Sequence, residues 1–229
     1  MSRVLTIAQI PTLRELYRRG SAAAAVPLCH PPTPALLDRV SLHNGDITKL
    51  NVDAIVNAAN RSLLVISVDG AIHRAAGGEL VKECACATLN GCDTGDAKIT
   101  RGYRLPARHV IHTVGPIFSQ SGGNGLEPIP ASHHLASCYR RSLEITTENC
   151  LRSIAFPCIS TGVYNYPNNE AARIALEEVR KYLDSDAGKT ARLIERVIFV
   201  VFLPMDEQIY ECLLPEYFPP PEAGASSGD

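Results

Sequence analysis

Short apolar segments alternate with longer amphipathic segments along most of this chain. DAIVNAAN at 53–60 and ERVIFVVFL at 195–203 have the length and the β-branched content of buried strands. PNNEAARIALEEVRKYL at 167–183 is typical of a helix, because Pro167 precedes an Asn-rich start and Glu170 comes early, where the helix dipole favours a carboxylate. Strands that alternate with helices predict an α/β domain whose mostly parallel sheet lies between two layers of helices.

The same patterns predict the remaining elements. Strands are expected at the start of 39–48, at 97–103, at 108–116 and at 153–160, and helices at 11–19, 69–89, 132–150 and 205–214. The pair Gly77-Gly78 interrupts the helical spacing within 69–89, so we expect a kink or a break there. Residues 1–39 form an N-terminal arm with a Pro-rich linker, 40–218 form the domain, and 219–229 form a tail that is expected to be disordered.

Composition and charge disfavour several functional classes. The chain has 22 basic and 24 acidic residues, a formal net charge of −2, so no overall positive field recruits nucleic acid. No apolar run approaches the ~18 residues that a membrane span needs. The first twenty residues lack the apolar block of a signal peptide, which predicts an intracellular protein, cytoplasmic or nuclear. A mitochondrial transit peptide stays open, although Pro11 and Glu15 argue against it.

The eight cysteines are expected to be reduced thiols, because the sequence favours an intracellular location. Cys84, Cys86 and Cys92 lie close together, but their spacing is not that of a zinc site and their segment contains no histidine. We therefore expect small, mostly buried thiols and no metal.

The predicted strand at 53–60 runs into a polar loop just after its β-branched residues, and ligands of such sheets gather beyond the carboxyl ends of the strands. Asn57 and Asn60 carry both donors and acceptors, which could hold ribose hydroxyls, or they could cap their own loop. Asp69 and His73 are one helical turn apart. Asp69 is either an ordinary helix N-cap or an ionised carboxylate that orients a water or a hydroxyl, and His73 either supports it or is simply half-buried.

A second loop follows the predicted strand at 153–160. Backbone N–H groups of residues 160–163 could cradle a phosphate, although an ordinary connecting turn is the alternative. Tyr164 and Tyr166 could cover a sugar or a base, or they could cap the core. Cys158 falls inside the predicted strand and is interpreted as a core residue rather than a nucleophile.

Four segments occur in order at natural spacing: GDITKLNVDAIVNAAN, VDGAIHRAAG, TGDAKITRGYRLPARHVIHTVGP and AFPCISTGVYNYP. Together they resemble the macrodomain family, specifically the MacroD-type ADP-ribosyl hydrolases, over about residues 40–218. The ending VFLPMDEQIYECLLPEYFP resembles the same subgroup, and IPTLRELY is similar to its short N-terminal arm. The resemblance implies a three-layer α/β/α sandwich around a mixed sheet, with ADP-ribose in a cleft at the strand ends.

The resemblance also implies the residues that bind the two ends of ADP-ribose. Asp46 would accept a hydrogen bond from the adenine amino group, with the Ile47 backbone beside it and Phe202 lining the adenine side. Asn57 and Asn60 would face the distal ribose.

Two loops would grip the diphosphate, and the reacting groups would lie next to them. The residues implied in these loops are Ser67, Val68 and Asp69 on one side and Ser160, Thr161, Gly162, Val163 and Tyr164 on the other, with Tyr164 packed on the distal ribose. The implied reaction is hydrolysis of the ester between ADP-ribose and a protein Asp or Glu, or of O-acetyl-ADP-ribose. An activated water attacks without a metal or another cofactor. Asp69 would orient or activate the water or the ribose, His73 would support Asp69, and Asn60 would position the sugar.

The implied partners are ADP-ribose and mono-ADP-ribosylated proteins. We expect a monomer, with neither membrane association nor sequence-specific binding of nucleic acid.

The chain departs from the family at two positions in these loops. Val65-Ile66-Ser67 replaces the usual run of four glycines, which permits positive φ and close approach of the backbone to the ligand. Ser67 could restore one hydrogen bond. This change puts catalysis in more doubt than binding, so a reader that binds ADP-ribose without turnover is the alternative function. A phosphatase of ADP-ribose phosphate is a third reading, but no separate nucleophile supports it. Asn165 replaces a glycine and is expected to be tolerated, because Asn adopts left-handed backbone geometry readily.

Overall fold

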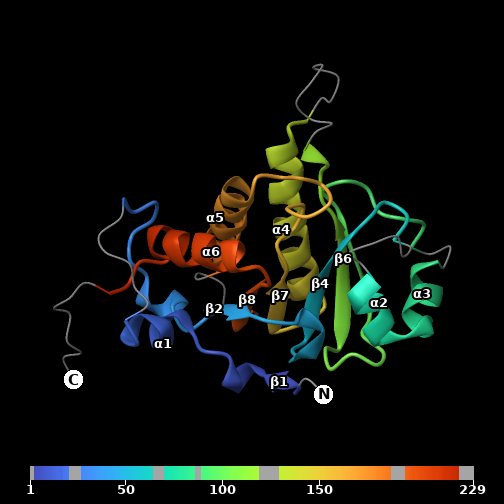
Figure 1. The fold of residues 1–229 in the computed structure, drawn as a ribbon, viewed down its shortest axis with the longest axis horizontal. Coiled ribbons are helices and arrows are strands. Elements are labelled where there is room, and N and C mark those ends of the chain that lie inside the picture. Colours follow the sequence, from blue (N-terminus) through green and yellow to red (C-terminus); the bar gives the residue numbers. More distant parts are fainter. Residues whose placement is uncertain are drawn as a thin grey trace.

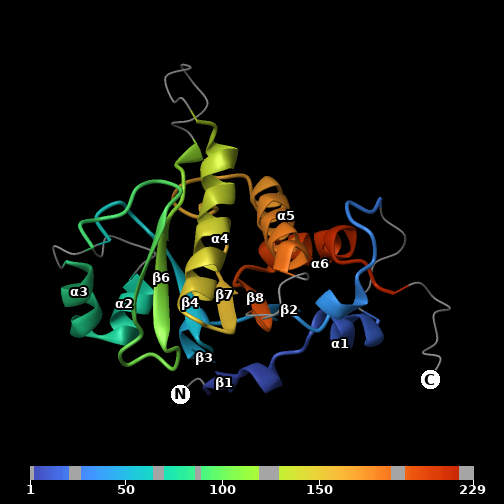
Figure 2. The same cartoon turned by 180° about the vertical axis from the view of Figure 1, so that it is seen from behind.

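The computed structural model describes residues 3–20, 27–63, 70–85, 89–118, 129–186 and 194–221. In this part of the chain a central sheet is covered by helices on both faces, as Figures 1 and 2 show from opposite sides. Leu64–Asp69, which includes the segment that replaces the glycines and Asp69 itself, lies outside the described residues. Residues 222–229, most of the predicted tail, also lie outside them.

The central sheet is mixed, as predicted. Its strand order is β2–β8–β7–β4–β6–β5, and only β5 runs antiparallel to its neighbour. The strands are β2 (Val40–Asn44), β4 (Ala54–Ala59), β5 (Ala97–Arg101), β6 (His109–Val114), β7 (Ser153–Phe156) and β8 (Arg196–Val201). Two short strands, β1 (Leu5–Thr6) and β3 (Leu50–Asn51), pair separately in parallel.

The helices form two layers. They are α1 (Leu13–Arg18), α2 (Gly70–Ala76), α3 (Gly78–Cys84), α4 (Ala131–Glu148), α5 (Asn168–Asp186) and α6 (Pro204–Tyr217), with short 3-10 turns at Ile7–Gln9, Pro34–Leu36 and Ile47–Lys49. Gly77 has φ +87° and separates α2 from α3, which confirms the predicted break. None of the helices in the described ranges is long and apolar enough to cross a bilayer.

Alternating side chains of each strand supply two hydrophobic cores. In β8, Val197, Phe199 and Val201 pack towards α4, α5 and α6, whereas Ile198 and Val200 pack towards α2 and α3. Both faces of the strand are therefore buried, which is why its sequence is continuously apolar instead of alternating. Figure 1 shows α4 and α5 on one side of β4 and β6, and α2 and α3 on the other.

The strand predicted at 153–160 is shorter than expected and ends at Phe156. Pro157 follows it and has no N–H to donate to the ladder, so the chain leaves the sheet there. Cys158 consequently lies in the loop after β7, not inside the strand. Burial raises the pKa of its thiol to about 12, so the interpretation of Cys158 as a packed thiol rather than a nucleophile agrees with its surroundings.

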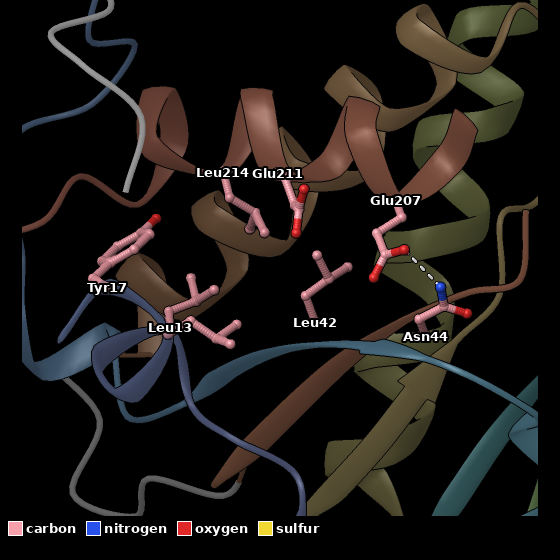
Figure 3. A pocket seen from close by; sticks show the side chains of 8 residues that line it. Leu13, Tyr17, Leu42, Asn44, Glu207, Glu211 and Leu214 are labelled. Carbon is pink, nitrogen blue, oxygen red and sulfur yellow. Dashed lines mark hydrogen bonds between the residues drawn. The ribbon is translucent and has the colours of Figure 1, made fainter. Parts of the chain in front are cut away.

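The N-terminal arm packs on the domain. Leu13 is fully buried in the core beside α6, and the Tyr17 hydroxyl donates to the carbonyl of Phe218 at 2.9 Å. A pocket of about 80 Å³ lies where α1 faces β2 and α6, and Figure 3 shows the side chains that line it. Asn44 Nδ2 donates to Glu207 Oε2 at 2.6 Å at its edge.

Arg180 on α5 joins the arm to the ends of two helices. Its side chain is buried, and its guanidinium donates to the carbonyls of Tyr217 and Pro31, to the Thr33 hydroxyl at 2.9 Å and to Asp184 at 2.7 Å. The five donors of an arginine fit this arrangement, and the carbonyls would lose buried partners without them.

We expect Arg180→Met to lower the free energy of unfolding by at least about 2 kcal/mol, because each buried carbonyl left without a donor costs about 1–3 kcal/mol. Chemical denaturation monitored by circular dichroism measures the change. Arg140→Met is the matched control, since Arg140 is half-exposed and pairs with Glu178 at 3.3 Å, and it should cost under about 1 kcal/mol. Equal losses in the two variants would contradict a structural role for the buried guanidinium.

Asp53 ties the amino ends of β4 and β7 together. Its Oδ2 accepts from the backbone N–H of Arg152 at 2.9 Å and from the Ser153 N–H and hydroxyl at 3.1 and 3.0 Å, and its Oδ1 accepts from Arg108 at 2.9 Å. Burial alone raises a carboxyl pKa, but these donors stabilise the charged form, so the pKa of Asp53 lies below its ordinary value.

The depressed pKa predicts how stability changes with pH. Because the folded-state pKa lies below the unfolded value of about 3.9, Asp53 stabilises the fold above that pH, and the stabilisation is lost as pH falls through the folded-state pKa. Asp53→Asn should therefore lower the midpoint of urea unfolding at pH 7, and the difference from wild type should shrink at pH 3. Asp93→Asn, at a fully solvated carboxylate paired with Arg61, should leave the midpoint nearly unchanged. A difference for Asp53→Asn that does not vary with pH would contradict the argument.

Candidate functional site

The residues predicted to bind the ligand follow parallel strands and lie along one edge of the sheet. Asp46 follows β2, Phe202 follows β8, Ser160 lies in the loop after β7, Asn60 follows β4, and Gly115 follows β6. Parallel strands end at the same edge, so these positions form a row in the order of the strands. Asp46 and Asn60 are three strand spacings apart, about 14 Å.

At one end of the row, Asp46 caps the short turn at Ile47–Lys49. Its Oδ1 accepts from the backbone N–H of Thr48 at 2.9 Å and from the Thr48 hydroxyl at 2.7 Å. Within the described part of the chain, Oδ2 has no hydrogen-bond partner, and the residue is exposed. The carboxylate is thus held in place while one oxygen can accept from a ligand. Ile47 is partly buried beside it and packs on the core next to α2.

Phe202 lies close to Asp46. The N–H of Gly45 donates to the carbonyl of Val201 at 3.0 Å, which joins the two segments. Phe202 is 73% exposed, unusual for a ring that directly follows a buried strand, and Leu203 beside it is 51% exposed. An exposed aromatic ring next to a fixed carboxylate suits a flat, partly polar ligand group. Leu203 was not predicted as a site residue from the sequence, and only its unusual exposure in the structure identifies it as one.

The loop after β7 adopts a strained backbone. Ser160 has φ +66° and Asn165 has φ +53°, both in the left-handed region that non-glycine residues rarely enter. The carbonyls of Ser160 and Gly162 accept from Tyr166 and Asn165 at 3.0 and 2.9 Å, so two hydrogen bonds close the turn. Asn165 thus adopts the left-handed backbone conformation that asparagine was expected to tolerate. Backbone strain of this kind persists where the surrounding structure enforces it, often at ligand sites.

The donors that this loop offers are backbone amides. The N–H groups of Thr161, Gly162 and Val163 have no acceptor among the described residues, and Gly162 and Val163 are exposed. The Thr161 hydroxyl donates to the carbonyl of Cys158 at 3.1 Å, and the Ser160 hydroxyl is buried. Successive unengaged amides in a tight turn can bind an anion without help from the hydroxyls.

The loop after β7 crosses over the end of β4. A Cβ at Gly115, directly after β6, would lie 2.0 Å from Ser160 Oγ, and the N–H of Phe118 donates to the carbonyl of Tyr164 at 3.0 Å. Since β4 lies between β6 and β7, these contacts place the loop beside Asn60. Phe118 was also missed by sequence reasoning, and its ring packs 4.9 Å from that of Tyr166.

The two asparagines of β4 differ in surroundings. Asn60 is partly exposed, and its Oδ1 accepts from the N–H and hydroxyl of Ser62 at 3.0 and 2.6 Å, as the loop-capping interpretation predicts. Asn57 lies within β4, is 2% exposed, and its Nδ2 lies 3.1 Å from His112 Nδ1 on β6.

A buried polar cluster lies between Asn57 and the helices α2 and α3. The ring of His73 is 6.0 Å from that of His112, and the ligand atoms of His73, Cys84 and His112 all lie within 4.8 Å of one another. Two imidazoles and a thiol are a typical zinc set. However, His112 already engages Asn57 with Nδ1 and the Thr100 hydroxyl with Nε2 at 2.9 Å, so the hydrogen bonds account for its placement. Sequence reasoning missed this cluster, because β6 brings His112 to Cys84 from far along the chain.

Ser67, Val68 and Asp69 lie outside the described residues, so their predicted roles stay predictions. The segments on either side are placed. Leu63 ends the described segment after β4 with φ +58°, and Gly70 begins α2, which carries His73. Residues 64–69 therefore join the segment after β4 to the helix that carries His73.

Comparisons with known proteins bear on the family of this chain and on its fold. The family model "Macro domain" matches residues 56–175. ADP-ribose glycohydrolase MACROD1 of Rattus norvegicus is 55% identical over 185 residues, which are 80% of this chain and 67% of that protein. Macro domain-containing protein mll7730 of Mesorhizobium japonicum is 56% identical over 175 residues, 76% of this chain and 92% of that protein.

A solved structure shares the same fold. The Trypanosoma brucei macrodomain in complex with ADP-ribose superposes with a TM-score of 0.74 at 40% identity, covering 93% of this chain and 78% of that one. The chain spans between 37% and 67% of the length of the MACROD1 and MACROD2 relatives it matches. On the matched family model, the sequence identities and the fold together, this chain belongs to the macrodomain family.

Proposed function

We propose that this chain binds ADP-ribose along the carboxyl edge of its sheet and hydrolyses the ester that joins ADP-ribose to protein Asp or Glu side chains. O-acetyl-ADP-ribose is a related substrate, and the reaction uses an activated water and no metal. The order of groups along the edge carries the proposal: a fixed carboxylate beside an exposed ring, then a loop of unengaged amides, then two asparagines. Adenine, diphosphate and distal ribose follow in the same order in the ligand. The Trypanosoma brucei relative was crystallised with ADP-ribose, and the rat relative is named a glycohydrolase.

Asp46 and Phe202 bind the adenine end of the ligand. Asp46 Oδ2 accepts from the adenine amino group, while the bonds of Oδ1 to Thr48 hold the carboxylate still. The Phe202 ring covers the base, which removes apolar surface from water at little entropic cost because the side chain is short and stiff. Ile47 lies beside the base.

The diphosphate lies against the loop from Ser160 to Tyr164. The amides of Thr161, Gly162 and Val163 donate to its oxygens, and the loop needs no reorganisation because two internal hydrogen bonds already fix it. Ser67, Val68 and Asp69 approach from the opposite side. Tyr164 packs on the distal ribose.

The chemistry takes place at the distal ribose, next to Asn57, Asn60 and His73. Asp69, directly before α2, orients or activates the attacking water or the ribose, and the start of the helix favours its charged form. Asn60 positions the sugar, and His73, one turn along α2, supports Asp69. Mono-ADP-ribosylated proteins are the partners, and the chain acts on them as a monomer.

A reader of ADP-ribose without turnover is the second candidate. Val65-Ile66-Ser67 stands where the family has glycines, and Val and Ile resist the positive φ that glycine permits. A displacement of about 1 Å at a reacting centre can cost on the order of a hundredfold in rate. The adenine end and the amides of the loop after β7 do not depend on these side chains.

Release of ADP-ribose from a protein that is mono-ADP-ribosylated on Asp or Glu separates the two candidates. We expect wild type to release ADP-ribose and Asp69→Ala to do so at least about a hundredfold more slowly, because a positioned acid–base group contributes about 10²–10⁴ in rate. Calorimetric titration with ADP-ribose should show that both proteins still bind. Wild type that binds ADP-ribose but releases none would contradict the hydrolase and establish the reader.

Substitutions of Asn165 test the diphosphate loop. Asn165→Gly should bind ADP-ribose as wild type does, because glycine adopts φ +53° freely. Asn165→Val should bind about five- to thirtyfold more weakly, since the left-handed conformation costs an L-residue about 1–2 kcal/mol and more for a β-branched one. Thermal unfolding of each variant controls for loss of fold. If both variants bind equally well, the left-handed turn is not required for binding.

A further inference from the structure

A buried carboxylate on α6 plays no part in the proposed reaction. Asp206 lies in the first turn of this helix and is 6% exposed. Nδ2 of Asn168, the first residue of α5, donates to Asp206 Oδ1 at 2.6 Å. The thiol of Cys158 also forms a hydrogen bond with the Asp206 side chain, and an ionised carboxylate can only accept, so the thiol donates. A buried carboxylate is costly unless donors satisfy it, and these two donors offset the cost of its burial.

The two donors lie at opposite ends of the loop that is proposed to bind the diphosphate. This loop, residues 157–167, connects β7 to α5. Cys158 is its second residue, and Asn168 follows directly after its last. Asp206 comes from a third element, α6, and its carboxylate therefore joins the start of the loop to the end. The separation of the two ends is set by a side chain that does not belong to the loop.

Hydrogen bonds inside the loop carry this anchorage to the amides. The Thr161 hydroxyl donates to the carbonyl of Cys158 at 3.1 Å, and the N–H of Tyr166 donates to the carbonyl of Ser160 at 3.0 Å. Ile159, between Cys158 and Ser160, is fully buried. The position of Cys158 therefore sets the position of Thr161, whose N–H is the first of the three that are proposed to bind the diphosphate.

The charge of Asp206 suits a place between two helix starts. The amino end of a helix carries a partial positive charge, and Asp206 lies at the start of α6 while it contacts the first residue of α5. Burial and the charge of Asp206 raise the pKa of the Cys158 thiol to about 12, so the thiol stays protonated at neutral pH and keeps its hydrogen for the carboxylate. The contact at the start of the loop therefore persists throughout the physiological pH range.

We propose that Asp206 is a positioning residue for the diphosphate: it holds both ends of the loop after β7 and thereby keeps the amides of residues 161–163 directed at the ligand. This inference rests on the proposed function, because it takes these amides to bind the diphosphate. Asp206 is buried, so it acts through the loop and not by touching the ligand.

An exchange of the two side chains tests the contact at the end of the loop. Asn168→Asp places a second carboxylate next to Asp206, and the repulsion should separate the end of the loop from α6. We expect ADP-ribose to bind about three- to tenfold more weakly, the effect of one lost hydrogen bond. Adding Asp206→Asn should restore the affinity, because the new amide donates to the carboxylate at position 168 while its oxygen still accepts from Cys158.

Adenosine is the matched ligand, because it reaches the end of the site formed by Asp46 and Phe202 but carries no phosphate. NMR titration of the full chain should show that Asn168→Asp weakens the binding of ADP-ribose and leaves the affinity for adenosine unchanged. Equal weakening of both ligands, unchanged binding of ADP-ribose, or no recovery in the double variant would overturn the inference. Wild type that fails to bind ADP-ribose at all would instead overturn the proposed function, so the two failures are distinguishable.

Two substitutions of Cys158 test the start of the loop and cover the case in which the Asn168 variants do not fold. Cys158→Ser keeps a donor for Asp206, whereas Cys158→Ala removes it. If the thiol only fills space, alanine should be tolerated at least as well as serine, because a hydroxyl is more costly to bury than a methyl group. Positioning predicts the reverse: Cys158→Ser should keep the wild-type ratio of ADP-ribose to adenosine affinity, and Cys158→Ala should lower it about threefold or more. A Cys158→Ala protein with the wild-type ratio, or with a higher ratio than Cys158→Ser, would contradict the proposal.

Discussion

The parallel pairing of β4, with β7 on one side and β6 on the other, determines where Asn60, Gly115 and the loop after β7 lie. Because the three strands point the same way, their exits meet at one edge, and the loop after β7 can reach across β4 to Gly115. The close contact of Gly115 with Ser160 leaves no room for a side chain there. A substitution at Gly115 would therefore move the amide-bearing loop even though the residue itself offers no functional group.

Most of the helices and strands could be predicted from the sequence, because segments such as 195–203 and 167–183 have the apolar patterns that are typical of a buried strand and of a helix. Where prediction failed, a single residue or a distant contact decided the outcome. Pro157 ended β7 before Ser160, although the apolar pattern continued. Asn57 was expected where its strand runs into a polar loop, but the pairing of β4 with β6 keeps this residue inside the strand and buried.

The candidate site was predictable residue by residue only through the family resemblance. Local chemistry left each asparagine, the loop of residues 160–163 and the aspartate with an ordinary alternative. The buried partners of Asn57 were not predictable at all. His112 and Thr100 carry no recognisable spacing relative to Asn57, since strands far apart along the chain bring them together. The exposure of Phe118 and Leu203 is likewise a property of the fold, not of the local sequence.

Asp53 and the candidate site occupy opposite ends of the same strand. Asp53 joins the amino ends of β4 and β7 through four hydrogen bonds. The residues that are proposed to bind the ligand lie at the carboxyl ends of these strands, which are separated from the amino ends by the length of β4, roughly 20 Å. The partners of Asp53 include none of the residues at the carboxyl edge. The sequence at the reacting edge can therefore change during evolution, as it has at Val65-Ile66-Ser67, without altering the residues that bind Asp53. Changes in the reaction that such proteins catalyse need not be limited by the stability of the fold.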